Sequence, residues 1–363
     1  MFITICVIAY NEENTLKAVL QDIKAQDYDH KDMEVLLVDS ASTDGTRKIM
    51  HDFAKENTAD TQMGFRDVKV LQNPKRTLPC GWNVALKAFK GEAILKVDAH
   101  ASIPSDFVRK NVEVLESGED ICGGQRPNIA DNPTPFRNTL LLAETSMFGS
   151  SIAPYRNNPG RSYVKSMFHA AYRRKVFDKT GEFNENLART EDNEMHYRMR
   201  KAGFKLCFEP QIISYQHTRS SLPKMLKQKY ANGYWIGLTS GVCPQCLSLY
   251  HFVPFVFVLA ILLSLVCCAG FGIAAAQGIA FTGILRLFYK AVMSLTALMW
   301  GLYWLLAVFM ALVAVIGNPK FRNITCLLLP VLFFLLHVSY GIGTVAGLIK
   351  MPFWVKGIED GRN

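Results

Sequence analysis

Acidic residues are almost absent from the C-terminal part of this 363-residue chain. After Pro210 the only carboxylates are Glu359 and Asp360, whereas ten Lys and Arg residues occur between Pro210 and Ile358. This imbalance excludes an evenly solvated globule, and a hydrophobic content of 50% excludes disorder of the whole chain. The net charge of +9 could suggest a nucleic-acid partner, but the unopposed positive charge lies beside long apolar runs and fits a membrane surface better.

Charged residues are also missing from three long segments, Phe252–Ala276, Ala291–Gly317 and Ile324–Ile349. A bilayer core of about 30 Å needs roughly 20 helical residues, so each segment is long enough to span a membrane. We therefore predict three transmembrane helices. Small residues inside them suit close helix packing, namely Gly270, Gly272, Gly341, Gly343 and Gly347.

No signal peptide is recognisable, because strand-like residues start at Phe2 without a basic segment before them. We expect the first half to remain in the cytoplasm, with the lipid bilayer as a partner. The basic cluster before the first apolar run agrees with the positive-inside rule and consists of Arg219, Lys224, Lys227 and Lys229. Three spans would place Arg286 and Lys290 on the outer side, so a re-entrant or interfacial segment at 277–290 is an alternative. The nine cysteines are expected to be thiols.

Two nucleotide-binding motifs are missing, since no G-x-G-x-x-G follows the first strand-like run and no G-x-x-x-x-G-K-[ST] occurs. These absences disfavour a dinucleotide fold of the usual kind and a P-loop NTPase. The first half nevertheless alternates apolar strands with helices, which predicts an α/β domain with a parallel sheet and a site at the carboxyl ends of its strands. The predicted strands are Phe2–Tyr10, Glu34–Asp39, Val68–Leu71 and Ala93–Val97, and the predicted helices are Thr15–Gln26, Thr43–Glu56 and Gly81–Phe89.

Carboxylates follow two of these strands. Asp39 ends the second strand, Asp44 lies in the next loop, and Asp98 and His100 end the fourth strand. Because residues i and i+2 of a strand point to the same face, Asp98 and His100 can converge on one divalent cation and leave positions for phosphate oxygens. A surface D-x-H without a function is the alternative. Ser42 or Thr43 can cap the helix that follows.

Two further clusters carry charge. Glu191 and Asp192 stand at the start of a helix-like segment, where carboxylates can favour the helix dipole or serve as a general base. Residues 156–179 contain seven Lys or Arg and one acid, and they include Arg173 and Arg174. That stretch can be a solvated face, a lipid-facing patch or a site for a phosphate-bearing acceptor.

Five motifs occur in order: IAYNEENTL at 8–16, VDSASTDGT at 38–46, KVDAHA at 96–101, FHAAYRRKVFDKTGEFNE at 168–185 and TEDNEMHYRMRKAG at 190–203. Together they resemble the family 2 inverting glycosyltransferases with a GT-A fold. NPKRTLPCGWN at 73–83, the D-A-H variant, and the segments at 215–235 and 337–347 are similar to bacterial membrane-bound exopolysaccharide glycosyltransferases of the succinoglycan type.

The resemblance implies roles for individual residues. It assigns the binding of a nucleotide-sugar to Ala9, Tyr10, Glu12, Asp39, Asp44, Asn83 and Asp98. It assigns a divalent cation, Mg²⁺ or Mn²⁺, to Asp98, His100 and His217, although His100 stands where many members have a second aspartate. It makes Asp192 the catalytic base, with Glu191 beside it. It suggests contacts to the acceptor or its phosphate for Arg173, Arg174, Arg219, Gln228 and Trp235.

We therefore expect an inverting, metal-dependent transfer from a nucleotide-sugar, with UDP as the expected carrier, to a hydroxyl of a polyprenyl-diphosphate-linked saccharide. The resemblance places this reaction in exopolysaccharide or capsule synthesis at the bacterial inner membrane. The alternatives are a polyprenyl-phosphate sugar transferase, a processive synthase and an inactive nucleotide-binding scaffold. The expected parts are a cytoplasmic GT-A domain (1–220), amphipathic juxtamembrane helices (221–250), transmembrane helices (251–350) and a tail (351–363).

Overall fold

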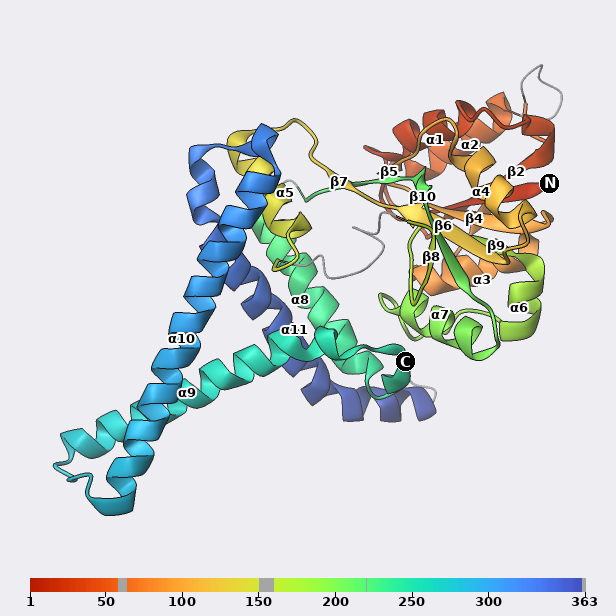
Figure 1. The fold of residues 1–363 in the computed structure, drawn as a ribbon. Helices are drawn as coiled ribbons and strands as arrows, with labels where there is room; N and C mark the ends of the chain where they lie inside the picture. The colour runs from red at the N-terminus through yellow and green to blue at the C-terminus, as the bar shows by residue number, and fades with distance from the viewer. Residues whose placement is uncertain (58–63, 150–159, 220, 361–363) are drawn as a thin grey trace.

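The computed structural model describes residues 1–57, 64–149, 160–219 and 221–360. Its first part is an α/β domain around a mixed sheet, and its last part is a set of long helices that extends to one side (Figure 1). Residues 156–159 of the predicted basic stretch, residue 220 at the predicted domain boundary and the last three residues of the predicted tail lie outside the described residues.

Within the described residues the main sheet has the strand order β3-β2-β1-β4-β9-β6-β10-β8. The four predicted strands are confirmed as parallel neighbours: β1 (Ile3–Ala9), β2 (Met33–Asp39), β3 (Asp67–Gln72) and β4 (Ala93–Asp98). The other half contains β6 (Ile121–Gln125) and β10 (Leu206–Ile213), which are parallel, and β9 (Ala171–Arg173) and β8 (Ser162–Val164), which are antiparallel to their neighbours. A second sheet has the order β5 (Ala101–Ser102), β11 (Tyr215–His217), β7 (Asn128–Ile129).

Helices cover both faces of the main sheet (Figure 1). One face carries α1 (Leu16–Lys24), α2 (Thr46–Glu56) and α4 (Phe107–Glu116), and the other carries α3 (Leu78–Ala88), α6 (Arg174–Thr180) and α7 (Glu191–Lys201). The side chains of β1 alternate between the two faces: Ile5 packs in the cluster that contains Leu16 of α1, and Cys6 packs in the cluster that contains Trp82 of α3. This two-sided burial explains the continuous apolar run of β1.

The predicted cap of the second helix was wrong. The second helix begins at Thr46 with Gly45 as its N-cap, so neither Ser42 nor Thr43 caps it. The backbone N–H of Asn11 donates to Ser42 Oγ (3.1 Å), and the backbone N–H of Thr43 donates to Asn11 Oδ1 (2.8 Å). The side chains of Ser42 and Asn11 thus connect the loops after β1 and β2. They take part in loop–loop hydrogen bonds and do not cap the N-terminus of the helix.

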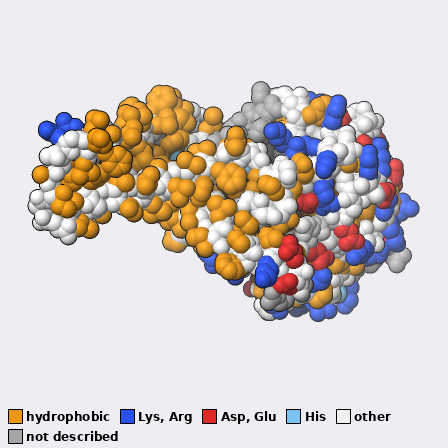
Figure 2. All heavy atoms as spheres, turned by 90° about the horizontal axis from the view of Figure 1, so that it is seen from below, with side chains coloured by type: hydrophobic (Ala, Val, Ile, Leu, Met, Phe, Trp, Pro, Cys, Tyr) orange, Lys and Arg blue, Asp and Glu red, His pale blue; other side chains and the backbone are white. Residues whose placement is uncertain are grey.

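The C-terminal half is helical and mostly apolar. It contains α5 (Pro135–Thr145), α8 (Leu222–Thr239), α9 (Val253–Ala276), α10 (Gly283–Gly317) and α11 (Leu329–Glu359). Three helices are long and apolar enough to cross a membrane, at Leu249–Ala276, Gly283–Gly317 and Ile324–Glu359, which agrees with the three predicted spans. Figure 2 shows apolar side chains gathered over the elongated helical end and charged side chains over the sheet domain. Helix α10 begins at Gly283 and runs unbroken through Arg286 and Lys290, and the alternative of a re-entrant or interfacial segment at 277–290 stays a prediction.

Glycines bring α8 and α11 into close contact. A Cβ atom added at Gly343 would lie 2.1 Å from Tyr230 O, and one at Gly347 would lie 2.1 Å from Tyr234 O. Gly341 is equally close to α9, because its Cβ would lie 2.3 Å from Pro254 O. The predicted packing role is therefore confirmed for these three glycines. It is wrong for Gly270 and Gly272, where an added Cβ would meet nothing within 4 Å.

Candidate active site

The register of the parallel strands brings three residues to one edge of the sheet. Ala9 at the end of β1 pairs with Asp39 at the end of β2, and Ile8 pairs with Asp98 at the end of β4. Asp39 is buried, and its Oδ1 accepts a hydrogen bond from the backbone N–H of Ser42 at 3.0 Å. Because the carboxyl ends of parallel strands form the ligand-binding edge of such sheets, this edge is the candidate site.

The loop after β1 is held against the loop after β2. The backbone N–H of Glu12 donates to Thr46 Oγ1 (2.7 Å), and the backbone N–H of Glu13 donates to Asp44 Oδ2 (3.2 Å). Asp44 therefore organises the two loops. The ring of Tyr10 is 46% exposed beside the buried Asp39, so it is available to a ligand at the mouth of the site.

Asp98 is surrounded by polar groups from other elements. Its Oδ2 lies 3.0 Å from His169 Nε2 and 3.5 Å from Arg126 Nη1. Burial opposes the charge on this carboxylate, but His169, Lys96 and Arg126 hold its pKa well below the usual range. Burial also lowers the pKa of His169, whose Nδ1 lies 2.8 Å from Ser214 Oγ. We conclude that Asp98 is ionised and held in a fixed orientation.

His100 contacts Glu12 and not Asp98, although the charge of Asp98 also acts on it. Strand β4 ends at Asp98, so the strand alternation that predicted a shared face does not extend to His100. The Nδ1 atom of His100 lies 3.0 Å from Glu12 Oε1, and this contact raises the pKa of His100. His217, the third predicted metal ligand, lies on β11 with Nε2 2.9 Å from Ser102 Oγ and Nδ1 2.6 Å from Asp131 Oδ1.

The described residues include no cluster of three or more His, Cys, Asp or Glu side chains that could hold a metal ion. The donor chemistry of Asp98 nevertheless fits Mg²⁺ or Mn²⁺. Its Oδ1 makes no hydrogen bond or ion pair within the described part of the chain. Magnesium ions are commonly bound by one or two carboxylates and completed by substrate phosphates and water.

A buried ion pair joins β4 to the start of α7. Lys96 Nζ lies 2.9 Å from Asp192 Oδ2, and the side chains of Lys96 and Asp192 are 6% and 13% exposed. The same ammonium group lies 5.7 Å from the ring centre of the buried Trp82. Burial disfavours the charge of Lys96, but Asp192, Asp98 and Glu191 together raise its pKa. Lys96 and Asp98 are separated by one residue on β4, so they project to the same face and link Asp192 to the strand edge.

Glu191 is the neighbour of Asp192 but has different surroundings. It is buried, and its Oε2 atom makes no hydrogen bond within the described structure. Burial and the charge of Asp192 raise the pKa of Glu191 to about 8. At neutral pH this carboxyl group is therefore mostly protonated, and of the two only Asp192 makes an ion pair with Lys96.

Two of the residues assigned from the resemblance have structural partners instead. The side-chain amide of Asn83 donates to Phe183 O (3.0 Å) and accepts from the backbone N–H of Phe183 (2.8 Å), so this buried group joins α3 to the turn before α7. Trp235 packs edge-on against Trp354 of α11, with ring centres 6.0 Å apart. The predicted contacts of Asn83 with the nucleotide-sugar and of Trp235 with the acceptor stay predictions beside these structural contacts.

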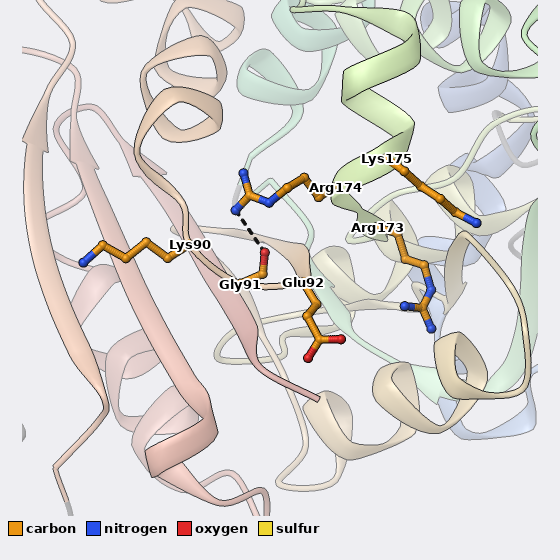
Figure 3. A pocket seen from close by; sticks show the side chains of 6 residues that line it. All are labelled: Lys90, Gly91, Glu92, Arg173, Arg174 and Lys175. Carbon is orange, nitrogen blue, oxygen red and sulfur yellow. Dashed lines mark hydrogen bonds between the residues drawn. The ribbon is translucent and has the colours of Figure 1, made fainter.

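Arg173 and Arg174 lie at the opposite edge of the sheet. Arg173 pairs with Ala93 at the start of β4, and Asp98 stands five residues farther along that strand, about 17 Å away. Both guanidinium groups donate to backbone carbonyls, such as Arg174 to Gly91 O at 3.0 Å. Figure 3 shows them at a cavity of about 400 Å³ lined by Lys90, Gly91, Glu92, Arg173, Arg174 and Lys175. The structure therefore places Arg173 and Arg174 away from Asp98, and their predicted contact with an acceptor stays a prediction.

Several residues of the site were not predicted from the sequence. Lys96 stands two residues before Asp98 in the K-V-D-A-H motif, and the strand alternation could have placed it on the same face. His169 belongs to the F-H-A-A-Y motif, but its role depends on a long-range contact with β4. Arg126 follows β6, and no sequence pattern connects it with Asp98.

Two family models match the chain. The model described as glycosyl transferase family 2 matches residues 4–181, and the one described as glycosyl transferase family group 2 matches residues 93–338.

Three curated proteins are similar in sequence. The dolichyl N-acetyl-alpha-D-glucosaminyl phosphate 3-beta-D-2,3-diacetamido-2,3-dideoxy-beta-D-glucuronosyltransferase of Methanococcus voltae is 25% identical over 96% of this chain and 98% of its own length. The succinoglycan biosynthesis protein ExoA of Rhizobium meliloti is 25% identical over 63% of this chain and 67% of its own. The undecaprenyl-phosphate 4-deoxy-4-formamido-L-arabinose transferase of Edwardsiella ictaluri is 26% identical over 46% of this chain and 52% of its own.

Proposed function

Because the chain belongs to glycosyl transferase family 2, we propose that it transfers a sugar from a nucleotide-sugar, with UDP as the carrier, to a hydroxyl group of a lipid-linked saccharide and inverts the anomeric configuration. The predicted family and the predicted α/β domain followed by long apolar helices are thereby confirmed. The observation that supports the proposed reaction most strongly is the Lys96–Asp192 pair beside Asp98 at the ligand-binding edge of the sheet.

In the proposed reaction the nucleotide lies along this edge. Tyr10 and Asp39 face the base, and Asp98 faces the diphosphate. The acceptor hydroxyl attacks the anomeric carbon from the side opposite the diphosphate, while Asp192 takes the hydroxyl proton. The bond from the anomeric carbon to the phosphate oxygen breaks, and its electron pair leaves with the nucleoside diphosphate. One displacement inverts the configuration, and no covalent enzyme intermediate is needed.

Lys96 supports this assignment of the base. A hydroxyl is a poor nucleophile at neutral pH, and a positioned base typically contributes about 10²–10⁴-fold to its reaction. The ion pair uses Asp192 Oδ2 and leaves Oδ1, which makes no hydrogen bond within the described residues, for the acceptor. Glu191 is mostly protonated and cannot compete as the base, although its unpartnered oxygen can contact the substrate.

A divalent cation bound by Asp98 would neutralise the charge that develops on the leaving diphosphate. His100 is the second candidate ligand in this proposal, because only its Nδ1 makes a hydrogen bond within the described residues and its Nε2 remains for a ligand. His217 would require a rearrangement, because both of its ring nitrogens already contact Ser102 and Asp131.

We place the reaction at the cytoplasmic face of a bacterial inner membrane, with residues 1–220 in the cytoplasm and 221–250 at the membrane surface. The three apolar helices support a membrane location. A lipid-linked acceptor is supported by the name of the methanococcal relative, which is a transferase for a dolichyl N-acetylglucosaminyl phosphate, and by that of the rhizobial relative, which belongs to succinoglycan biosynthesis.

A second candidate is transfer of the sugar directly to a polyprenyl phosphate, which the similarity to undecaprenyl-phosphate sugar transferases favours. A phosphate acceptor is already ionised and needs no base, so the buried Lys96–Asp192 pair would then have no catalytic task. This difference makes the two functions separable by experiment.

The test is incubation of the purified full chain in lipid nanodiscs with a panel of nucleotide-sugars and two acceptors, a polyprenyl phosphate and a polyprenyl-diphosphate-linked saccharide. Mass analysis of the lipid products identifies the acceptor that gains a sugar, and NMR of the product gives the anomeric configuration. Transfer only to the polyprenyl phosphate, or retention of configuration, would contradict the proposal.

A further inference from the structure

Arg189 and Arg219 are two cations that the proposed chemistry does not use. Arg189 lies in the segment before α7, and Arg219 follows β11. Arg189 Nη1 donates to Asn232 Oδ1 at 2.8 Å, and Arg219 Nε donates to Gln228 Oε1 at 3.4 Å. Gln228 and Asn232 are one helical turn apart on α8, where residues i and i+4 lie about 5–6 Å from each other on one face. Helix α8 thus holds the two guanidinium groups next to each other.

Neither guanidinium group makes an ion pair with a carboxylate of the described residues, although Arg219 is close enough to Glu12, the partner of His100, to act on its charge. Among the described residues, Arg189 and Arg219 make no ion pair, whereas Arg198 pairs with Glu194 and Arg161 pairs with Glu119. Desolvation and the like charge of Arg219 lower the pKa of Arg189, and Glu191 opposes this shift only in part. Both arginine side chains reach solvent. An anion between them would relieve their repulsion.

Arg189 and Arg219 lie between α7, which carries the proposed base, and the helices that can span a membrane. Arg189 precedes Glu191 and Asp192 at the start of α7, and the adjacent Thr190 hydrogen-bonds to Thr239 of α8 through their hydroxyl groups. Helix α8 in turn packs along α11, one of the three helices that can span a membrane. A ligand held by the pair therefore lies between the base and the membrane-spanning helices, whereas Asp98 on β4 faces the donor.

We propose that Arg189 and Arg219 bind the phosphate or diphosphate group that joins the acceptor saccharide to its lipid. This inference rests on the proposed transfer to a lipid-linked saccharide. Two planar guanidinium groups match the oxygens of a phosphate with paired hydrogen bonds. With the lipid phosphate fixed there and the chain in the bilayer, the saccharide extends toward Asp192, so the pair selects acceptors that carry a charged lipid link.

The test measures binding without turnover, with the full chain in phosphatidylcholine nanodiscs. The probes are farnesyl diphosphate, the uncharged farnesol with the same hydrocarbon chain, and UDP. Charge-assisted hydrogen bonds contribute enough that Arg189→Gln and Arg219→Gln should each weaken farnesyl diphosphate binding at least about tenfold. Binding of farnesol and UDP should stay within about twofold of wild type, which also verifies that the variants are folded. Arg189→Lys, which keeps the charge but loses the planar donors, should give an intermediate loss.

The matched controls are Lys224→Gln and Lys227→Gln, which remove one positive charge each from exposed positions of the same helix. Both should bind farnesyl diphosphate as the wild type does. Equal losses in the controls and the arginine variants would overturn the proposal in favour of a general charge effect. A loss of UDP binding in the arginine variants, with unchanged farnesyl diphosphate binding, would assign the pair to the donor instead. If the wild type glycosylates a lipid-linked saccharide but the arginine variants bind farnesyl diphosphate normally, this inference is overturned. The proposed function would then still stand.

Discussion

Lys96 Nζ lies 2.9 Å from Asp192 Oδ2, and this buried contact is the only ion pair between β4 and α7 in the described part of the chain. It connects a strand that ends at the donor side with the helix that carries the proposed base. Because a buried charge that loses its partner is strongly destabilised, each member of the pair fixes the position of the other.

Replacement of the lysine tests this coupling. We expect Lys96→Met to lower kcat about 10²-fold, because misplacement of a catalytic group by about 1 Å can cost that much, and to leave UDP binding near normal. In an Asp192→Asn background the same change should cost little, since residues that act as a unit are not additive. Steady-state kinetics of the wild type, the two single variants and the double variant measure this double-mutant cycle. Lys87→Met, at an exposed ion pair with Glu182, is the control. Additive losses would show that Lys96 acts independently of Asp192.

The two adjacent carboxyl groups should respond differently to neutralisation. Asp192→Asn keeps the shape but cannot accept a proton, so transfer should fall by about 10²–10⁴-fold while UDP-sugar affinity stays near normal. Glu191→Gln should be mild at neutral pH, because Glu191 is already mostly protonated there. Product formation and calorimetric binding of the donor measure both effects. If Glu191→Gln were inactive and Asp192→Asn active, Glu191 and not Asp192 would be the general base.

The pH dependence of stability gives an independent measure of Glu191. Its pKa is about 8 in the folded chain, whereas a free Glu titrates near 4.3. The folded state thus binds a proton that the unfolded state has already lost between these pH values, so the wild type loses stability as pH rises from about 4.3 to 8. The melting temperature of Glu191→Gln minus that of wild type should increase over this range and level off above pH 8. A constant difference would exclude the raised pKa.

A divalent cation should be required for turnover. With excess chelator we expect transfer to stop and Mg²⁺ or Mn²⁺ to restore it, because a single carboxylate and the donor diphosphate can hold such an ion. Asp98→Ala should remove both turnover and the heat of Mn²⁺ binding in the presence of UDP, whereas His100→Ala should weaken the ion without abolishing its binding. Full activity in excess chelator would contradict the metal requirement, and calorimetry provides the readout that is independent of activity.

The fold was more predictable from sequence than the site. The apolar runs of β1, β2 and β4 are buried on both faces, so local composition alone identified them, and the half-buried edge strand β3 was identified by its Val and Leu residues. The three apolar helices were equally evident, because their length and lack of charge are local properties. The short strand β9 could not be predicted, since its three residues are stabilised by pairing with β4 and β6 from distant parts of the chain.

The composition of the site depends on contacts that sequence does not encode locally. Asp39, Asp98 and Asp192 were proposed from position and resemblance, and the structure brings Asp39 and Asp98 to one edge and joins Asp192 to it through Lys96. The basic residues Arg173 and Arg174 seemed equally suitable from charge alone. Their position was decided by the antiparallel insertion of β9, which turns them toward the start of β4.

The last prediction concerns the contact of α8 with α11, which connects the catalytic domain to the membrane part. A side chain at Gly343 would meet the backbone of Tyr230 at 2.1 Å, and a backbone cannot move aside as the tip of a side chain can. We therefore expect Gly343→Val to separate the two helices and to lower the melting temperature in detergent by several degrees, since overpacking typically costs about 1–3 kcal/mol. Activity should fall as well, because α8 also holds Arg189 through Asn232 and Thr190 through Thr239.

Gly270→Val is the matched control, since it adds the same side chain to another apolar helix where nothing of the described residues lies within 4 Å. The fraction of monodisperse protein, the melting temperature and the transfer rate should all remain near wild type in this control. If both valine variants were equally stable and active, the close packing of α8 on α11 would not exist in the membrane, and the catalytic helix would have to be positioned by the sheet domain alone.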